Sequence, residues 1–140
     1  MALVTFVNDS APYLNADNLN NNFTECNNII DSGSNANGSY IKFSDGTLMQ
    51  WGEATKTITS TTALASGGYR SAGFDFSFPI EFYNTSISVV AMSSGGGIGI
   101  LLDSSSTTKA KFQASWWTSA SNSTSRDGRI SWQAIGRWKA

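Results

Sequence analysis

The chain has 140 residues, a formal net charge of −1, and charged side chains at only 14% of its positions. This length suits one domain, or one domain with a short appendage, and the slight negative charge argues against non-specific nucleic-acid binding, which needs a basic face. No segment reaches the ~18 apolar residues of a membrane span, and the start lacks the basic and apolar regions of a signal peptide, so we expect synthesis in the cytoplasm and no membrane insertion.

The first predicted element is an extended run that precedes a helix. Pro12 keeps the residue before it extended, and large apolar side chains flank it. The run could dock in a groove of a larger assembly, or it could tuck against the chain's own domain. The residues that would make this contact are Phe6, Pro12, Tyr13 and Leu14.

A short amphipathic helix is predicted next, capped by Asn15 or Asp17. Its apolar residues follow at spacings of four, three and four, as in the seam of a coiled coil. The other positions are mostly weak helix formers, so the helix needs a partner that covers its stripe. Symmetry-related copies and the chain's own β domain are both possible partners. The stripe consists of Leu19, Phe23, Cys26 and Ile30.

A boundary is expected after residue 37. Asparagine is dense before it, whereas aromatic and β-branched residues dominate after Gly38. Residues 31–38 have the composition of a flexible linker. We therefore divide the chain into an appendage (1–37), which holds the extended run, the helix and the linker, and a β domain (38–140).

The β domain shows seven or eight short strands separated by turn signals such as Asp45-Gly46 and Ser66-Gly67-Gly68. This spacing predicts an all-β fold, an antiparallel β-sandwich of jelly-roll type. The strands are expected near residues 39–43, 47–53, 55–62, 73–78, 84–92, 97–102, 109–117 and 128–138.

Little in the sequence indicates catalysis. Histidine, the commonest general base and a frequent zinc ligand, is absent, and the single Cys26 rules out a disulfide or thiolate cluster within one chain. Paired carboxylates could cleave a sugar, but each in the β domain fits a turn or surface role better. We expect no enzyme activity, no metal and no cofactor. The carboxylates are Asp45, Glu53, Asp75, Glu81, Asp103 and Asp127.

Two loops have the residue types of a recognition surface. A Ser/Asn-rich segment follows Trp116-Trp117, and an aromatic-basic pair follows Gly67-Gly68. Aromatic faces stack on sugars or peptides, while hydroxyls and amides supply adaptable hydrogen bonds. Neighbouring residues on a strand point to opposite faces, so one of the two tryptophans belongs to the core. The candidate contact residues are Tyr69, Arg70, Trp117, Ser121, Asn122 and Arg126.

Three segments in order resemble the C-terminal receptor-recognition domain of tailed-bacteriophage tail fibres, over roughly residues 38–140. They are the hairpin-like stretch that ends in Gln50-Trp51-Gly52, the segment Phe78-Pro79-Ile80-Glu81-Phe82, and the closing Trp132-Gln133-Ala134-Ile135-Gly136. The resemblance implies a homotrimeric virion fibre protein, made in the host cytoplasm, whose β domain attaches to a host-surface glycan or protein. Under this resemblance the helix stripe would serve trimerisation.

A second resemblance concerns residues 6–20, which look like the opening of many small phage structural proteins and imply attachment to other virion proteins. Fibres with this terminal domain usually carry a long shaft before it, and this sequence has almost none. A head fibre or capsid-decorating protein with little or no receptor binding is therefore the alternative. A lectin unrelated to phage is disfavoured by the missing signal peptide and the anchor-like start.

Overall fold

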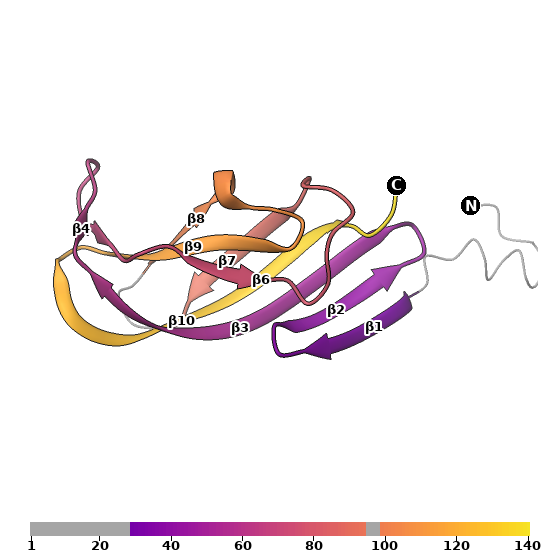
Figure 1. The fold of residues 1–140 in the computed structure, drawn as a ribbon, viewed down its shortest axis with the longest axis horizontal. Coiled ribbons are helices and arrows are strands. Elements are labelled where there is room, and N and C mark those ends of the chain that lie inside the picture. The colour runs from indigo at the N-terminus through magenta and orange to yellow at the C-terminus, as the bar shows by residue number, and fades with distance from the viewer. Residues whose placement is uncertain (1–28, 95–98) are drawn as a thin grey trace, which may run out of the picture.

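The structure is a computed structural model that describes residues 29–94 and 99–140 (Figure 1). Within these ranges every regular element is a strand except one 3-10 turn, η1 (Ser104–Ser106), and all strand pairs are antiparallel, which confirms the predicted fold class. The strands are β1 (Ile29–Asn35), β2 (Gly38–Phe43), β3 (Thr47–Ser60), β4 (Thr62–Ala63), β5 (Tyr69–Arg70), β6 (Phe74–Ser77), β7 (Ser88–Ser93), β8 (Gly99–Asp103), β9 (Lys111–Thr118) and β10 (Asn122–Arg137).

Two sheets make up the sandwich. The first has the order β1-β2-β3-β10-β7, and its two long strands β3 and β10 run along the length of the molecule (Figure 1). The second is built around β9, which pairs with β8 on one edge and with β5 and β6 on the other. Both sheets therefore depend on a central strand from the last third of the chain.

The core lies between the sheets and is rich in aromatic rings. Strict alternation sends Ile130, Trp132 and Ala134 of β10 inward, and Phe112 and Trp116 of β9 meet them from the other sheet. Ring centroids of Phe112 and Trp132 are 5.4 Å apart, within the range of favourable edge-to-face contacts. Alternation along each strand thus places one set of these side chains in the core and leaves the other set outside it.

Most of the predicted strands exist, but the predicted break between residues 53 and 55 does not. Residues 47–53 and 55–62 were expected as two strands, whereas β3 runs without interruption from Thr47 to Ser60. The reason is its partner, because β10 pairs with β3 from Arg137 opposite Thr47 to Asn122 opposite Ser60, with a register shift only between Asn122 and Arg126. Because β10 continues past the expected break, with Ile130 opposite Ala54, it supplies backbone hydrogen bonds there and β3 does not end.

The prediction of a flexible linker at residues 31–38 is wrong for most of that range. Residues up to Asn35 belong to β1, which pairs with β2 as far as Asn35 opposite Gly38. The Asn35 side chain accepts a hydrogen bond from the Asn37 N–H at 2.9 Å and donates to the Pro79 carbonyl at 2.8 Å. Backbone pairing and these side-chain contacts supply the order that Ser, Gly and Asn lack as a free segment.

Ile30 also departs from its prediction. It lies in β1 with 51% of its surface exposed, so it cannot be the last residue of the helical stripe. The other members, Leu19, Phe23 and Cys26, lie outside the described residues, as do the helix itself and the extended run at Phe6, Pro12, Tyr13 and Leu14. Their proposed roles stay predictions.

The two ends of the molecule differ. The start of β1 and the C-terminus lie at the same end, whereas the β4–β5 connection (64–68) and the β9–β10 turn (119–121) lie at the opposite end, at the left of Figure 1. We call the latter the distal end. It is farthest from the point where the chain enters the first sheet.

Candidate interaction surfaces

The distal end brings together three of the residues predicted to bind a partner. Tyr69 and Arg70 form the short strand β5, which pairs with the end of β9, so that Arg70 lies opposite Trp117. The Trp117 indole N–H donates to the Gly67 carbonyl at 3.4 Å. Trp117 is half-buried while its neighbour Trp116 is fully buried, as alternation requires. One tryptophan serves the core and the other supports the distal loop.

Glycine is required in that loop. Gly68 has a φ of +82°, which L side chains rarely adopt, and a Cβ there would lie 2.4 Å from Nε1 of Trp117. The backbone can therefore lie directly against the indole. This close approach holds the connection before Tyr69 in a defined conformation.

The β9–β10 turn adds polar groups at the same end. Thr118 Oγ1 donates to the Ala120 carbonyl at 2.8 Å, and Asn122 Oδ1 accepts from the Thr124 N–H at 3.0 Å. Ser121 is exposed and Asn122 is half-buried. Short local hydrogen bonds of this type fix a turn without any regular ladder. The turn thus presents hydroxyl and amide groups near the Trp117 loop.

Arg126 is placed differently from the other predicted contact residues. It has the same parity on β10 as the buried Gly128 and Ile130, and its Nε and Nη2 atoms are buried with no hydrogen-bond partner in the described part of the chain. Its guanidinium group is therefore partly enclosed on the core side of β10. Its role as a contact residue stays a prediction, and its geometry favours a structural role.

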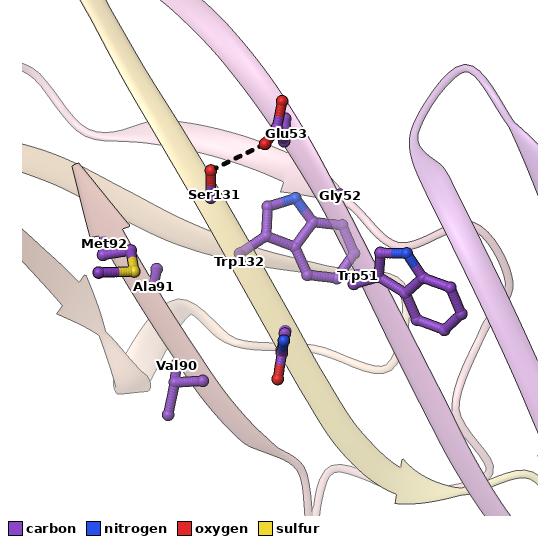
Figure 2. A pocket seen from close by; sticks show the side chains of 9 residues that line it. Trp51, Gly52, Glu53, Val90, Ala91, Met92, Ser131 and Trp132 are labelled. Carbon is purple, nitrogen blue, oxygen red and sulfur yellow. Dashed lines mark hydrogen bonds between the residues drawn. The ribbon is translucent and has the colours of Figure 1, made fainter. Parts of the chain in front are cut away.

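A second surface lies on the outer face of the first sheet. A groove of about 660 Å³ is lined by consecutive residues of three neighbouring strands. Figure 2 shows Trp51 on one side of this groove and Val90 and Met92 on the other. These three side chains are 39%, 60% and 68% exposed, although each is large and apolar. The lining residues are Trp51, Gly52, Glu53, Val90, Ala91, Met92, Ser131, Trp132 and Gln133.

Sequence reasoning missed this groove. It assigned Trp51-Gly52 to a family-like motif and placed no function on residues 89–92. A signal was present, because the run Val89-Val90-Ala91-Met92 is apolar at both parities, which is typical of a strand covered on both faces. Among the residues that the structure describes, only the inner parity of this strand is packed against the core.

The carboxylates occupy separate structural positions. Asp75 pairs with Lys111 and accepts from Gln113, and the hydrogen bond from Lys111 lowers the pKa of Asp75 below its usual value. Asp103 caps η1, and hydrogen bonds from Ser105 and then Ser106 lower the pKa of Asp103. Among the residues that the structure describes, no three His, Cys, Asp or Glu side chains are grouped so that they could hold a metal ion. The same residues include no helix long and apolar enough to cross a membrane.

Comparison with known proteins decides the family. Residues 42–137 match the family described as "Putative tail fiber protein gp53-like, C-terminal". The chain belongs to this tail-fibre family. It is therefore a component of a tail fibre. The match covers most of residues 38–140, the region that resembles the receptor-recognition domain of tail fibres. No protein of curated function matches the chain.

Solved structures with a similar fold are also fibres. The R1 pyocin fibre of P. aeruginosa (C-terminal residues 323–701) has a TM-score of 0.58 at 13% identity, over 97% of this chain and 35% of that one. An N-truncated R1-type pyocin tail fibre has a TM-score of 0.56 at 14% identity, over 90% and 99%. The corresponding R2 pyocin fibre gives 0.56 at 13%, over 98% and 33%. This chain thus spans about a third of the first structure, and the likeness at these identities is one of fold.

Proposed function

We propose that this chain forms the receptor-binding tip of a homotrimeric tail fibre and attaches the particle to a glycan or protein on the host surface. The observation that carries the proposal is the distal end. There, Tyr69, Arg70 and Trp117 lie beside a turn with exposed hydroxyls, farthest from the point where the chain enters the sheet. A fibre presents this end to a cell if its shaft joins at the opposite one.

The chemistry of the distal end suits adhesion by several weak contacts. An aromatic side chain can stack on a sugar or peptide, Arg70 can donate to an anionic or hydroxyl group, and Ser121 and Asn122 can adapt their hydrogen bonds. Each contact alone is weak. Three tips in one fibre, and several fibres on one particle, would convert low single-site affinity into firm attachment through a high effective concentration.

We propose a binding role without catalysis. In the described part of the chain the two carboxylates with lowered pKa are engaged by Lys111 and Gln113 or by Ser105 and Ser106, which favours structural roles. A general acid for glycoside cleavage needs a raised pKa instead. The proposal therefore includes no substrate turnover, no metal and no cofactor.

The tail-fibre family supports a tail location over the alternative of a head fibre or capsid-decorating protein. Attachment to other virion proteins through Phe6, Pro12, Tyr13 and Leu14 remains part of the proposal. It concerns residues outside those that the structure describes.

The test is cell binding by the purified, fluorescently labelled full chain, measured by flow cytometry on a panel of bacterial strains that includes P. aeruginosa. On strains that bind the wild type, Tyr69→Ala and Arg70→Ala should each lower the bound fluorescence at least tenfold. Tyr83→Ala is the matched control, because Tyr83 is 51% exposed and its N–H donates to the Arg137 carbonyl near the other end. Equal losses in all three variants, or no binding to any strain, would contradict the proposal.

A further inference from the structure

The outer face of the first sheet carries large apolar side chains on β3, β7 and β10, with Ser131 and Gln133 of β10 between those of β3 and β7. Register places Trp51 of β3 opposite Gln133 of β10, which in turn lies opposite Val90 of β7. The neighbouring rows add further large side chains of the same parity, of which Ile135 is 45% exposed and Met49 half-buried. We call these residues the apolar face: Met49, Trp51, Val90, Met92 and Ile135.

A face of this kind is costly in water. Monomeric proteins scatter single apolar residues over their surfaces, whereas a contiguous apolar patch with a polar rim marks an interface. Here the rim is polar at both ends of the strands, with Thr55 opposite Arg129 at one end and Thr47 opposite Arg137 at the other. The arrangement is that of an interface core and its rim.

The rim carries one charge of each sign close to the groove. Glu53 is exposed and accepts a hydrogen bond from Ser131 at 3.2 Å. Arg129 is also exposed, and it has no ion-pair partner within residues 29–94 and 99–140. The same surface thus offers a carboxylate and a guanidinium, so that it can be complementary to a second copy of itself.

We infer that the apolar face is covered by a neighbouring copy of this chain. Trp51 on the β3 side of one copy packs against Val90 and Met92 on the β7 side of the next, and Glu53 of one copy pairs with Arg129 of another. Such a contact joins two different parts of the face, so it is heterologous, and it closes into a ring of three when each copy is rotated by a third of a turn from the last. The inference rests on the proposed homotrimer and names the surface that builds it.

A host glycan is the less suitable occupant of the same groove. Glycans need many hydrogen-bonding groups beside each aromatic platform, since their own surface is dense with hydroxyls. Here the two most exposed apolar side chains of the lining are the aliphatic Val90 and the thioether Met92. Burial of apolar surface, which a second copy supplies, matches them better.

The first test is the mass of the full chain in solution by light scattering. The wild type should have about three times the mass of the 15.0 kDa protomer. Met92→Asp should weaken association at least 100-fold while the circular dichroism spectrum stays that of a folded β protein. Leu101→Asp is the matched control, because Leu101 is 38% exposed and lies on β8 of the other sheet. It should remain a trimer.

A disulfide test remains informative even if another segment also holds the copies together. In a Cys26→Ser background, Trp51→Cys combined with Val90→Cys should give covalent trimers on mild oxidation. Within one copy the two positions lie on strands separated by β10, hence about 9–10 Å apart, too far for an internal disulfide. Val90→Cys with Leu101→Cys should not form trimers.

Charge reversal tests the polar contact. Glu53→Arg and Arg129→Glu should each weaken association, and mixing the two variants should restore it in part, because two of the three contacts in a mixed trimer then pair opposite charges. No cross-linking in Trp51→Cys with Val90→Cys, together with an unchanged trimer in Met92→Asp, would overturn the inference. A trimer that keeps its mass in Met92→Asp but loses cell binding would instead assign the face to the receptor.

The outcomes separate the two proposals. Failure of the wild type to bind any cell while cross-linking succeeds would leave the copy interface standing and remove the receptor role. A monomeric wild type that binds cells through Tyr69 and Arg70 would remove the copy interface and leave the receptor role standing.

Discussion

The side-chain amide of Gln50 forms two hydrogen bonds with the backbone of Ile80. Gln50 Nε2 donates to the Ile80 carbonyl at 2.9 Å, and the Ile80 N–H donates to Gln50 Oε1 at 3.0 Å. Gln50 is only 1% exposed, although its neighbours in the core are apolar. The loop that it holds carries Phe78 and Phe82, whose rings meet edge to face with centroids 4.9 Å apart. A single buried amide on β3 therefore positions two aromatic side chains of the core.

Replacement of Gln50 should destabilise the fold. Gln50→Leu keeps the volume but leaves the Ile80 N–H and carbonyl without partners, and we expect a loss of about 2–4 kcal/mol in the free energy of unfolding. Urea denaturation at one fixed protein concentration measures it. The matched control is Gln113→Leu, which removes one exposed hydrogen bond to Asp75 and should cost about 0.5–1 kcal/mol. Equal losses of stability in the two variants would show that the hydrogen bonds between Gln50 and the Ile80 backbone are not the cause of the effect.

Gly52, next to the exposed Trp51, should tolerate no side chain. A Cβ there would lie 2.6 Å from the Asn37 carbonyl oxygen and 2.9 Å from Cζ2 of Trp132, and neither the backbone nor the buried ring can move freely. We expect Gly52→Ala to cost about 1–3 kcal/mol, in the range of overpacked cores. Thermal and urea unfolding measure the effect. Gly99→Ala is the control, because its Cβ would meet Trp117 at 3.6 Å, an ordinary contact, and a loss as large there would contradict the steric explanation.

The ion pair between Asp75 and Lys111 should make stability depend on acid pH. The Lys111 hydrogen bond lowers the pKa of Asp75 in the folded state below its usual 3.8. The stabilisation is therefore complete above pH 3.8 and is lost as the pH falls through the lower folded-state value. Asp75→Asn should lower the thermal midpoint at pH 7, and the difference should vanish at strongly acid pH.

Both residues of this pair are well exposed, so the difference should be small. Asp127→Asn serves as the control, since Asp127 is exposed and forms no ion pair with any residue that the structure describes. It should change the midpoint little at either pH. A difference for Asp75→Asn that persists unchanged in acid would mean that the ion pair is not its cause.

Arg126 and Arg70 should behave in opposite ways. Arg126→Met keeps the apolar stem and removes the buried Nε and Nη2 atoms, which have no hydrogen-bond partner among the described residues. Stability should therefore stay unchanged or rise by about 1 kcal/mol, with cell binding retained. Arg70→Ala should leave stability within about 0.5 kcal/mol and lower cell binding. Unfolding curves and flow cytometry on the same preparations separate the two roles. Loss of cell binding in Arg126→Met would show that Arg126 contacts the receptor after all.

Local sequence determined much of this fold. The Asp45-Gly46 turn predicted a hairpin, and the structure has it, with the Gly46 N–H donating to the Phe43 carbonyl at 3.0 Å and Gly46 at a φ of +93°. Alternation along a strand predicted that one of Trp116 and Trp117 belongs to the core, and Trp116 is the buried one. The order of aromatic-glycine segments indicated the tail-fibre family. These features depend only on residues within a few positions of one another.

Tertiary structure decided the rest. Ser, Gly and Asn in residues 31–35 read as linker, yet they form a strand because the edge of β2 offers them a ladder. Nothing in the sequence around Trp51 or Met92 showed that the two would border one groove, since β10 brings β3 and β7 together from the far end of the chain. Local patterns fix how a strand alternates and where it turns. Which strand lies beside it follows from contacts between residues distant in sequence, which leave no local signal.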